Sequence, residues 1–147
     1  MASETLAVFG FITLMLVIVA LTLLWVRNLA HHREQGLRQR FPNARAIVSG
    51  ANFFGQHSKG NLQILGTGAL VITEHDLLFE QWLPRREHSI PLNQIKAIET
   101  PRSELGKTNF TPLLKVVYRT ANGAQDAMTW NVRDLEAVKA LLLESVG

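Results

Sequence analysis

The sequence contains no cysteine. Disulfides, thiolate nucleophiles and zinc–thiolate sites are therefore excluded, and the composition is compatible with a reducing compartment. A strong charge of one sign is also missing, because the net charge is only +3 over 147 residues. So small an excess suits proximity to an anionic membrane face better than a surface dedicated to nucleic acid.

Motifs that carry catalysis or bind cofactors are missing as well. The chain has no His-Glu-x-x-His pair for zinc, and no serine lies in a nucleophile elbow. Gly66-Thr67-Gly68 precedes an expected strand instead of opening a helix, which argues against a dinucleotide site. Gly106-Lys107-Thr108 imitates the end of a phosphate-binding loop, but Pro101 stands where that motif needs glycine. We therefore expect a protein that is not an enzyme and that uses no cofactor and no metal.

Charge is absent from one long stretch, Leu6–Val26, in which Thr13 and Thr22 are the only polar side chains. A helix of this length rises through about 30 Å, the thickness of the hydrocarbon core of a bilayer. Both hydroxyls can bond to carbonyls of the preceding turn, so neither leaves an unmet donor in lipid. A buried core helix is the alternative, but the rest of the chain is too small to surround one so long. The stretch predicts a single transmembrane helix.

The charges flanking this stretch are asymmetric. All fifteen lysines and arginines follow it, whereas the residues before it contribute one charged side chain, Glu4. Positive residues stay on the cytoplasmic side, so we expect the N-terminus outside and the remainder in the cytoplasm, at the plasma (cell inner) membrane. A cleaved signal peptide would need basic residues before the apolar run and a small-residue cleavage site, and neither is found.

The basic segment 28–43 is expected to continue the helix for two or three turns. Phe41-Pro42-Asn43 should end it, because the residue before a proline is pushed out of the helical region. The arginines of this segment either serve as a topology signal alone or also reach lipid phosphates. The chain thus divides into a transmembrane anchor (1–27), a basic juxtamembrane helix or linker (28–43) and a domain (44–147).

Short strands separated by turn residues are predicted from Ala44 onward. Asn122-Gly123 favours a primed turn, which makes the last two strands a hairpin. Leu62–Leu65 is either a further short strand or the lead-in to the next one, and Pro101–Pro112 is expected to be irregular. The expected strands are Ala44–Ser49 extended by Phe53-Phe54, Ala69–Thr73, Leu77–Trp82, His88–Ile90, Ile95–Thr100, Leu113–Thr120 and Gln125–Trp130.

The last predicted element is an amphipathic helix from Val132 to Ser145. Asn131 is expected to cap it, and Asp134 falls in its first turn, where a negative charge suits the helix dipole. Such a helix must cover apolar surface, and an open end of a bent antiparallel sheet is the natural partner. Its apolar stripe consists of Leu135, Val138, Leu141 and Leu142.

About seven strands followed by one closing helix resemble the pleckstrin-homology-like superfold, particularly its bacterial and GRAM-type branches. The resemblance implies a membrane-anchored α+β protein, in which a bent antiparallel β-sandwich or barrel follows the anchor and a C-terminal amphipathic helix caps it. Many members bind phosphoinositides through basic residues in the first inter-strand loop, where this chain has Lys59 with His57 nearby. The residues that carry the resemblance are Gly68–Thr73, Leu77-Leu78-Phe79, Ile90-Pro91-Leu92, Ile95, Ile98 and the helix after Trp130.

Together these observations predict a non-catalytic, membrane-tethered binding module that docks a protein partner, within a membrane complex. Binding of anionic lipid headgroups is the alternative, and an enzyme is the third. The expected partners are the lipids around the anchor and a protein, not nucleic acid. Arg102 and Lys107 could join three other bases of the domain on one rim, or all of these charges could be scattered and solvated. The candidate lipid-binding residues are Arg27, Arg33, Arg38, Arg40, Lys59, Arg85 and Arg86.

Overall fold

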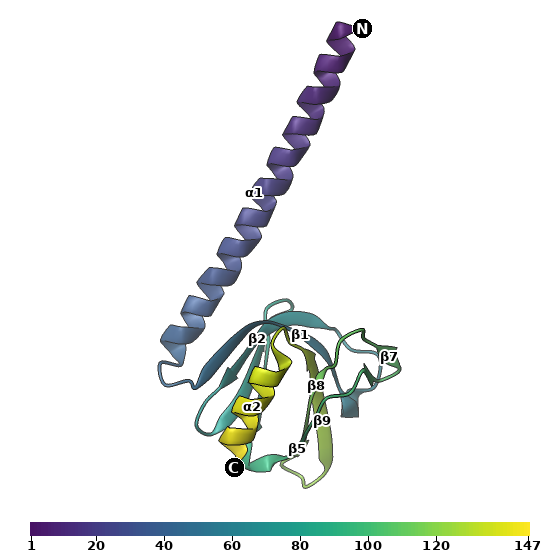
Figure 1. Ribbon diagram of the computed structural model, residues 1–147. Coiled ribbons are helices and arrows are strands. Elements are labelled where there is room, and N and C mark those ends of the chain that lie inside the picture. The colour runs from purple at the N-terminus through teal and green to yellow at the C-terminus, as the bar shows by residue number, and fades with distance from the viewer. The chain divides into compact units, whose positions relative to one another are not determined.

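The computed structural model describes every residue from Met1 to Gly147. The chain forms two compact units, Met1–Leu37 and Arg38–Gly147. One continuous helix, α1 (Ala2–Arg40), accounts for nearly all of the first unit and extends into the start of the second (Figure 1). It ends directly before Phe41 and Pro42, as the sequence predicts.

The helix α1 is long and apolar enough to cross a membrane, and its most apolar stretch has no buried residue. The hydroxyl of Thr13 donates to the carbonyl of Phe9 at 2.8 Å, and that of Thr22 donates to the carbonyl of Ile18 at 2.8 Å. Both polar side chains of the apolar run are thus satisfied within the helix, as a lipid environment requires.

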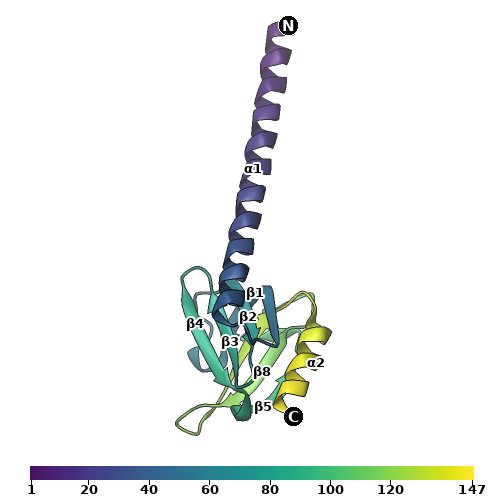
Figure 2. The same cartoon turned by 90° about the vertical axis from the view of Figure 1, so that its left-hand side faces the viewer.

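Seven antiparallel strands form the main sheet of the second unit, in the order β4-β3-β2-β1-β9-β8-β5 (Figures 1 and 2). The sheet is bent, and the helix α2 (Leu135–Val146) lies beside the edge strand β5. The predicted combination of an apolar N-terminal helix, an antiparallel sheet and a closing helix is confirmed. The strands are β1 (Ala46–Gln56), β2 (Gly66–Ile72), β3 (Asp76–Gln81), β4 (Arg86–Pro91), β5 (Ile95–Glu99), β8 (Leu114–Arg119) and β9 (Gln125–Asn131).

One hydrophobic core joins the inner face of this sheet to α2. Its centre is aromatic: the ring of Phe53 lies 5.6 Å from that of Phe79, and the ring of Trp130 lies 5.7 Å from Phe79. Val138 and Leu142 of α2 are buried in the same core, and Leu135 and Leu141 pack against it. The predicted apolar stripe therefore faces the sheet.

The start of the sheet differs from the sequence prediction. Strand β1 runs without interruption to Gln56, because the chain passes Gly50 as a bulge, with φ 77° and a register shift between Ser49 and Ala51. Leu62–Leu65 forms no strand and is the lead-in to β2. Gly68 lies inside β2, where a Cβ would approach the carbonyl oxygen of Glu80 to 2.1 Å, so only glycine fits against β3.

Two connections also differ from expectation. Thr120 and Ala124 close the hairpin between β8 and β9 around three residues, and only Gly123 has positive φ. The predicted primed turn at Asn122-Gly123 is therefore wrong, because the extra loop residue allows an ordinary turn followed by a left-handed glycine. The predicted irregular stretch 101–112 contains a small hairpin of β6 (Ser103–Glu104) and β7 (Lys107–Thr108).

The helix α2 begins three residues later than predicted. Asn131 remains in β9, where it pairs with Asn52, and Val132 is buried in the core, so neither can enter the helix. Asp134 is the cap instead, and its carboxylate accepts a hydrogen bond from the backbone N–H of Ala137 at 3.4 Å.

Candidate functional site

Three connections of the domain lie close together, although the third leaves the sheet at the end opposite to the other two and folds back. They are the β1–β2 connection with the 3-10 turn η1 (His57–Lys59), the β3–β4 connection 82–85, and the β5–β8 connection with the small hairpin. A Cβ placed on Gly55 would lie 2.8 Å from the side chain of Leu105, and one on Gly66 would lie 2.9 Å from the carbonyl oxygen of Leu83. We call residues 57–65, 82–86 and 101–112 the loop-end surface.

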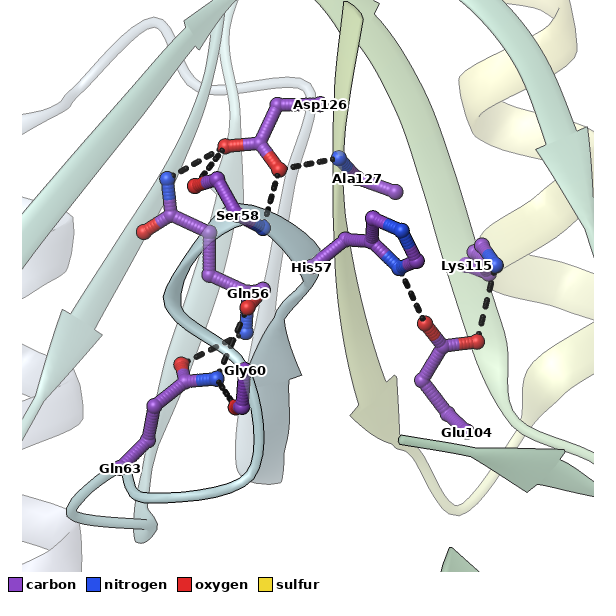
Figure 3. A network of polar contacts seen from close by, with 9 residues as sticks. All are labelled: Gln56, His57, Ser58, Gly60, Gln63, Glu104, Lys115, Asp126 and Ala127. Atoms are coloured by element: carbon purple, nitrogen blue, oxygen red, sulfur yellow. Dashed lines mark hydrogen bonds and ion pairs between the residues drawn. The ribbon is translucent and has the colours of Figure 1, made fainter. Parts of the chain in front are cut away.

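A buried carboxylate, Asp126 in β9, holds the first of these loops in place (Figure 3). It accepts hydrogen bonds from the backbone N–H of Ser58 at 2.9 Å and from the Ser58 hydroxyl at 2.7 Å. The side-chain amide of Gln56 donates to it at 2.6 Å, the backbone N–H of Ala127 at 2.8 Å and the hydroxyl of Tyr118 at 3.3 Å. Asp126 thereby attaches the turn η1 to the sheet.

The same loop is closed on itself by Gln63. The backbone N–H of Gln56 donates to the side-chain oxygen of Gln63 at 2.8 Å, and the side-chain amide of Gln63 donates to the carbonyl of Gln56 at 2.8 Å (Figure 3). That amide also donates to the carbonyl of Gly60. The loop between these residues therefore has a defined path.

A second carboxylate, Glu104, holds the small hairpin. It is only 7% exposed, and it binds the ammonium of Lys115 at 2.8 Å and lies 3.4 Å from the imidazole Nδ1 of His57 (Figure 3). The hairpin is thus connected both to β8 and to η1.

The pKa values of Asp126 and Tyr118 are those of groups that hold the structure together. Burial by itself would raise the pKa of Asp126, but the hydrogen bonds from Gln56, Ser58 and Ala127 outweigh it and hold that pKa below its usual value. Burial, followed by the neighbouring Asp126 carboxylate, raises the pKa of the Tyr118 hydroxyl well above its usual value. Asp126 therefore stays ionised and Tyr118 neutral near pH 7, and five donors already use the carboxylate.

The loops held in this way expose apolar side chains that sequence reasoning missed. Leu62 and Phe110 are each 99% exposed and Leu83 is 82% exposed, and Ile64 and Leu65 are exposed to a lesser degree. The only signal in the sequence is a large apolar residue within a stretch rich in turn residues. Isolated exposed leucines are common, but here five exposed apolar residues lie on three neighbouring connections.

Three of the sequence-predicted bases, Lys59, Arg85 and Arg86, belong to the loop-end surface, and so do Arg102 and Lys107. None of these five forms an ion pair, and Arg102 only donates to the carbonyl of Phe110 at 3.2 Å. The acid within the same loops is Glu104, which Lys115 neutralises. The surface therefore combines exposed apolar side chains with uncompensated positive charge.

Two bases of this surface also influence the ionisation of His88, which lies in β4. The imidazole stacks on Phe53 at 5.5 Å and on Phe79 at 6.3 Å between ring centroids. Burial, then the charges of Lys59 and Arg86, lower the pKa of His88 below its usual value. Lys59 of η1 and Arg86 of β4 thus act on one side chain, although they lie far apart in the sequence.

The other candidate bases lie in α1. Arg40 is engaged within the domain: its guanidinium binds Glu80 at 3.2 Å and Glu87 at 2.8 Å and lies over the ring of Phe41. The sequence did not predict this ion pairing, which arises because β3 and β4 present two carboxylates to Arg40, and the lipid-binding role of Arg40 stays a prediction. Arg27, Arg33 and Arg38 are outside the loop-end surface. No group of three or more histidine, aspartate and glutamate side chains in the chain is arranged to hold a metal ion.

Comparison with known proteins gives a fold and no function. No protein-family model matches the chain, and no curated protein is similar to it in sequence. The chain is similar to a solved structure described as the C-terminal domain of an unknown protein from Leishmania infantum, with a TM-score of 0.52 and 22% identity. The match covers 77% of this chain and 96% of that one, and at this identity it shows the fold alone.

Proposed function

We propose that this chain is a non-catalytic, membrane-tethered binding module with a pleckstrin-homology-like fold. In this proposal α1 crosses the plasma membrane once, with the N-terminus outside and the domain in the cytoplasm. The loop-end surface docks a protein partner within a membrane complex.

The membrane part of the proposal is supported by α1. Its apolar run is long enough to span the hydrocarbon core, and every lysine and arginine of the chain follows that run. The fold part is supported by a single bent sheet with one closing helix on its core face. Fold alone does not determine function, so the binding role is argued from the surface.

The observation that carries the binding role is the composition of the loop-end surface. Exposed apolar patches with polar rims mark interaction sites on soluble domains. Here Leu62, Leu83 and Phe110 supply exposed apolar side chains, and the same loops carry arginine and lysine side chains that form no ion pair. A matching partner has an apolar centre with acidic residues around it, because complementary charge accelerates and orients association.

The test is purification of the full-length protein from its native membrane in a mild detergent. We expect a partner that co-purifies in stoichiometric amount and that is lost from the variants Leu83→Asp and Phe110→Asp. Leu143→Asp is the matched control, because Leu143 is exposed on α2, away from the loops. Retention of the partner by both loop variants, or purification of the chain alone, would contradict the proposal.

A second candidate function, binding of anionic lipid, is favoured by one further observation. The three most exposed apolar side chains of the loop-end surface lie on three separate connections. Such separate tips can enter the headgroup region one by one while the surrounding bases contact anionic lipid.

Vesicle binding separates this candidate from the first. The fragment Arg38–Gly147, a compact unit by itself, should bind vesicles of phosphatidylcholine with phosphatidylserine and not vesicles of phosphatidylcholine alone. The binding should weaken with salt and with the double substitution of Arg85 and Arg86 by alanine, whereas Lys139→Ala on α2 should leave it unchanged. Equal binding to both kinds of vesicle would exclude this candidate.

A further inference from the structure

A cleft on a different part of the domain carries an inference that does not depend on the loop-end surface. It is lined by residues of β4 and by residues of the hairpin of β8 and β9. Figure 2 shows the tip of that hairpin near one end of β4. Its volume is about 630 Å³, and pockets that take small ligands measure about 300–1,000 Å³. The residues that line it include Ser89, Pro91, Gln94, Tyr118, Arg119 and Thr120.

The β4 wall of this cleft is an unpaired strand edge. Strand β4 is the last strand on its side of the sheet and pairs only with β3. The backbone N–H of Leu92 donates to the carbonyl of His75 at 2.8 Å, which fixes the alternation of this antiparallel ladder. By that alternation the backbone groups of Glu87 and Ser89 point away from β3, while Pro91 offers a carbonyl and no N–H.

The opposite edge of the sheet is not open in the same way. Strand β5 lies against α2, and the 3-10 turn η2 (Leu92–Gln94) that precedes it also contacts this helix. An open edge usually attracts another strand unless something covers it. Of the two edges of the sheet, β4 is therefore the one at which an extended chain has room to pair.

The far wall of the cleft is positively charged. Arg119 is exposed and forms no ion pair. The acids beside β4 already have partners: Glu87 binds Arg40 at 2.8 Å, and Asp76 accepts a hydrogen bond from the Ser89 hydroxyl at 3.5 Å. A ligand in the cleft therefore meets an uncompensated guanidinium opposite a row of free backbone groups.

We propose that β4 accepts an extended peptide segment of a partner protein as an additional strand, with an acidic side chain of that peptide on Arg119. Backbone hydrogen bonds to Glu87 and Ser89 would hold the peptide, and the charge on the far wall would select its sequence. Because Pro91 cannot donate, the ladder ends there, and the site takes a short segment. The surface and the chemistry of this site differ from those of the loop-end surface.

The test uses the full-length protein in detergent and a library of random peptides displayed on phage. We expect enrichment of peptides that carry an aspartate or glutamate within an apolar, strand-forming sequence. A synthetic copy of an enriched peptide should bind at least about fivefold more weakly to Ser89→Pro, which removes one outward N–H, and about tenfold more weakly to Arg119→Glu. Ser89→Ala and Arg133→Glu are the matched controls and should bind normally.

A second measurement does not depend on the folding of the proline variant. In the unsubstituted protein, the bound peptide should slow the hydrogen exchange of the Glu87 and Ser89 amides and leave the loop-end amides unchanged. No enrichment of acidic peptides, or binding that protects neither amide, would overturn the proposal. Peptide binding that survives Leu83→Asp and Phe110→Asp would separate this site from the proposed partner surface.

Discussion

Asp126 and Ser58 lie 68 residues apart, yet the carboxylate of one accepts hydrogen bonds from both the backbone N–H and the hydroxyl of the other, at 2.9 and 2.7 Å. The aspartate stands in β9 and the serine in η1. This pair connects the rigid sheet to the loop whose apolar tip is Leu62, so the stability of the domain and the shape of its candidate binding surface depend on the same carboxylate.

Replacement of Asp126 by alanine is expected to destabilise the domain by about 2–3 kcal/mol, because partly or fully buried hydrogen bonds from Gln56, Ser58 and Ala127 lose a charged acceptor. Thermal unfolding of the protein measures this loss. The matched control, Glu144→Ala, removes an exposed acid of α2 and should change stability by less than about 0.5 kcal/mol. Equal effects would mean that the network contributes nothing.

Stability is expected to fall in mild acid because of His88. Its pKa in the folded state is lowered, first by burial and then by Lys59 and Arg86. As the pH falls below the usual histidine pKa of about 6.5, His88 therefore binds a proton in the unfolded chain while it stays neutral in the folded chain. The free energy of unfolding should be level above that pH, decrease below it, and become level again beneath the folded-state pKa.

Urea unfolding over this pH range tests the effect, and His88→Phe is the variant to compare. The phenyl ring can keep the stacking on Phe53 and Phe79 while removing the titrating group. The variant should therefore lose most of the pH dependence. If the decrease below about pH 6.5 persists unchanged in His88→Phe, another group causes it.

The docking of α2 predicts a contrast between two neighbouring leucines. Leu142 is fully buried in the core, and Leu143 is 53% exposed. Leu142→Ala should cost about 2–5 kcal/mol and lower the melting temperature by many degrees, whereas Leu143→Ala should cost well under about 1 kcal/mol. Differential scanning calorimetry measures both, and two small, similar losses would show that the helix does not cover the sheet.

The proposed orientation predicts which end of the chain is accessible outside the cell. The chain has no cysteine, so Ser3→Cys and Ser103→Cys each create a single thiol. An impermeant maleimide should label the thiol at position 3 on intact cells and the thiol at position 103 only after lysis. Labelling in the reverse order would place the domain outside.

Several elements could be predicted from the sequence because their signals are local. The apolar run before Arg27 determines a helix by its length alone, and Pro42 determines where that helix ends. The spacing of Val138 and Leu142 identifies the buried face of α2 without knowledge of what it covers. In each case the residues that determine the element are close together in the sequence. They are therefore also close together in space, whatever the rest of the fold.

The rest was decided by tertiary structure. Asn131 is a good helix cap by residue type, but its pairing with Asn52 keeps it in β9 and transfers the cap to Asp134. The β5–β8 connection leaves the sheet at the end opposite to the β1–β2 and β3–β4 connections, and it comes near them only because its small hairpin folds back, which places Glu104 beside His57 and Leu105 beside Gly55. Sequence alone shows that Leu62, Leu83 and Phe110 are apolar and that Lys59 and Arg86 are charged. Whether such side chains are buried or exposed, scattered or gathered, depends on contacts between residues far apart in the chain, which local patterns do not encode.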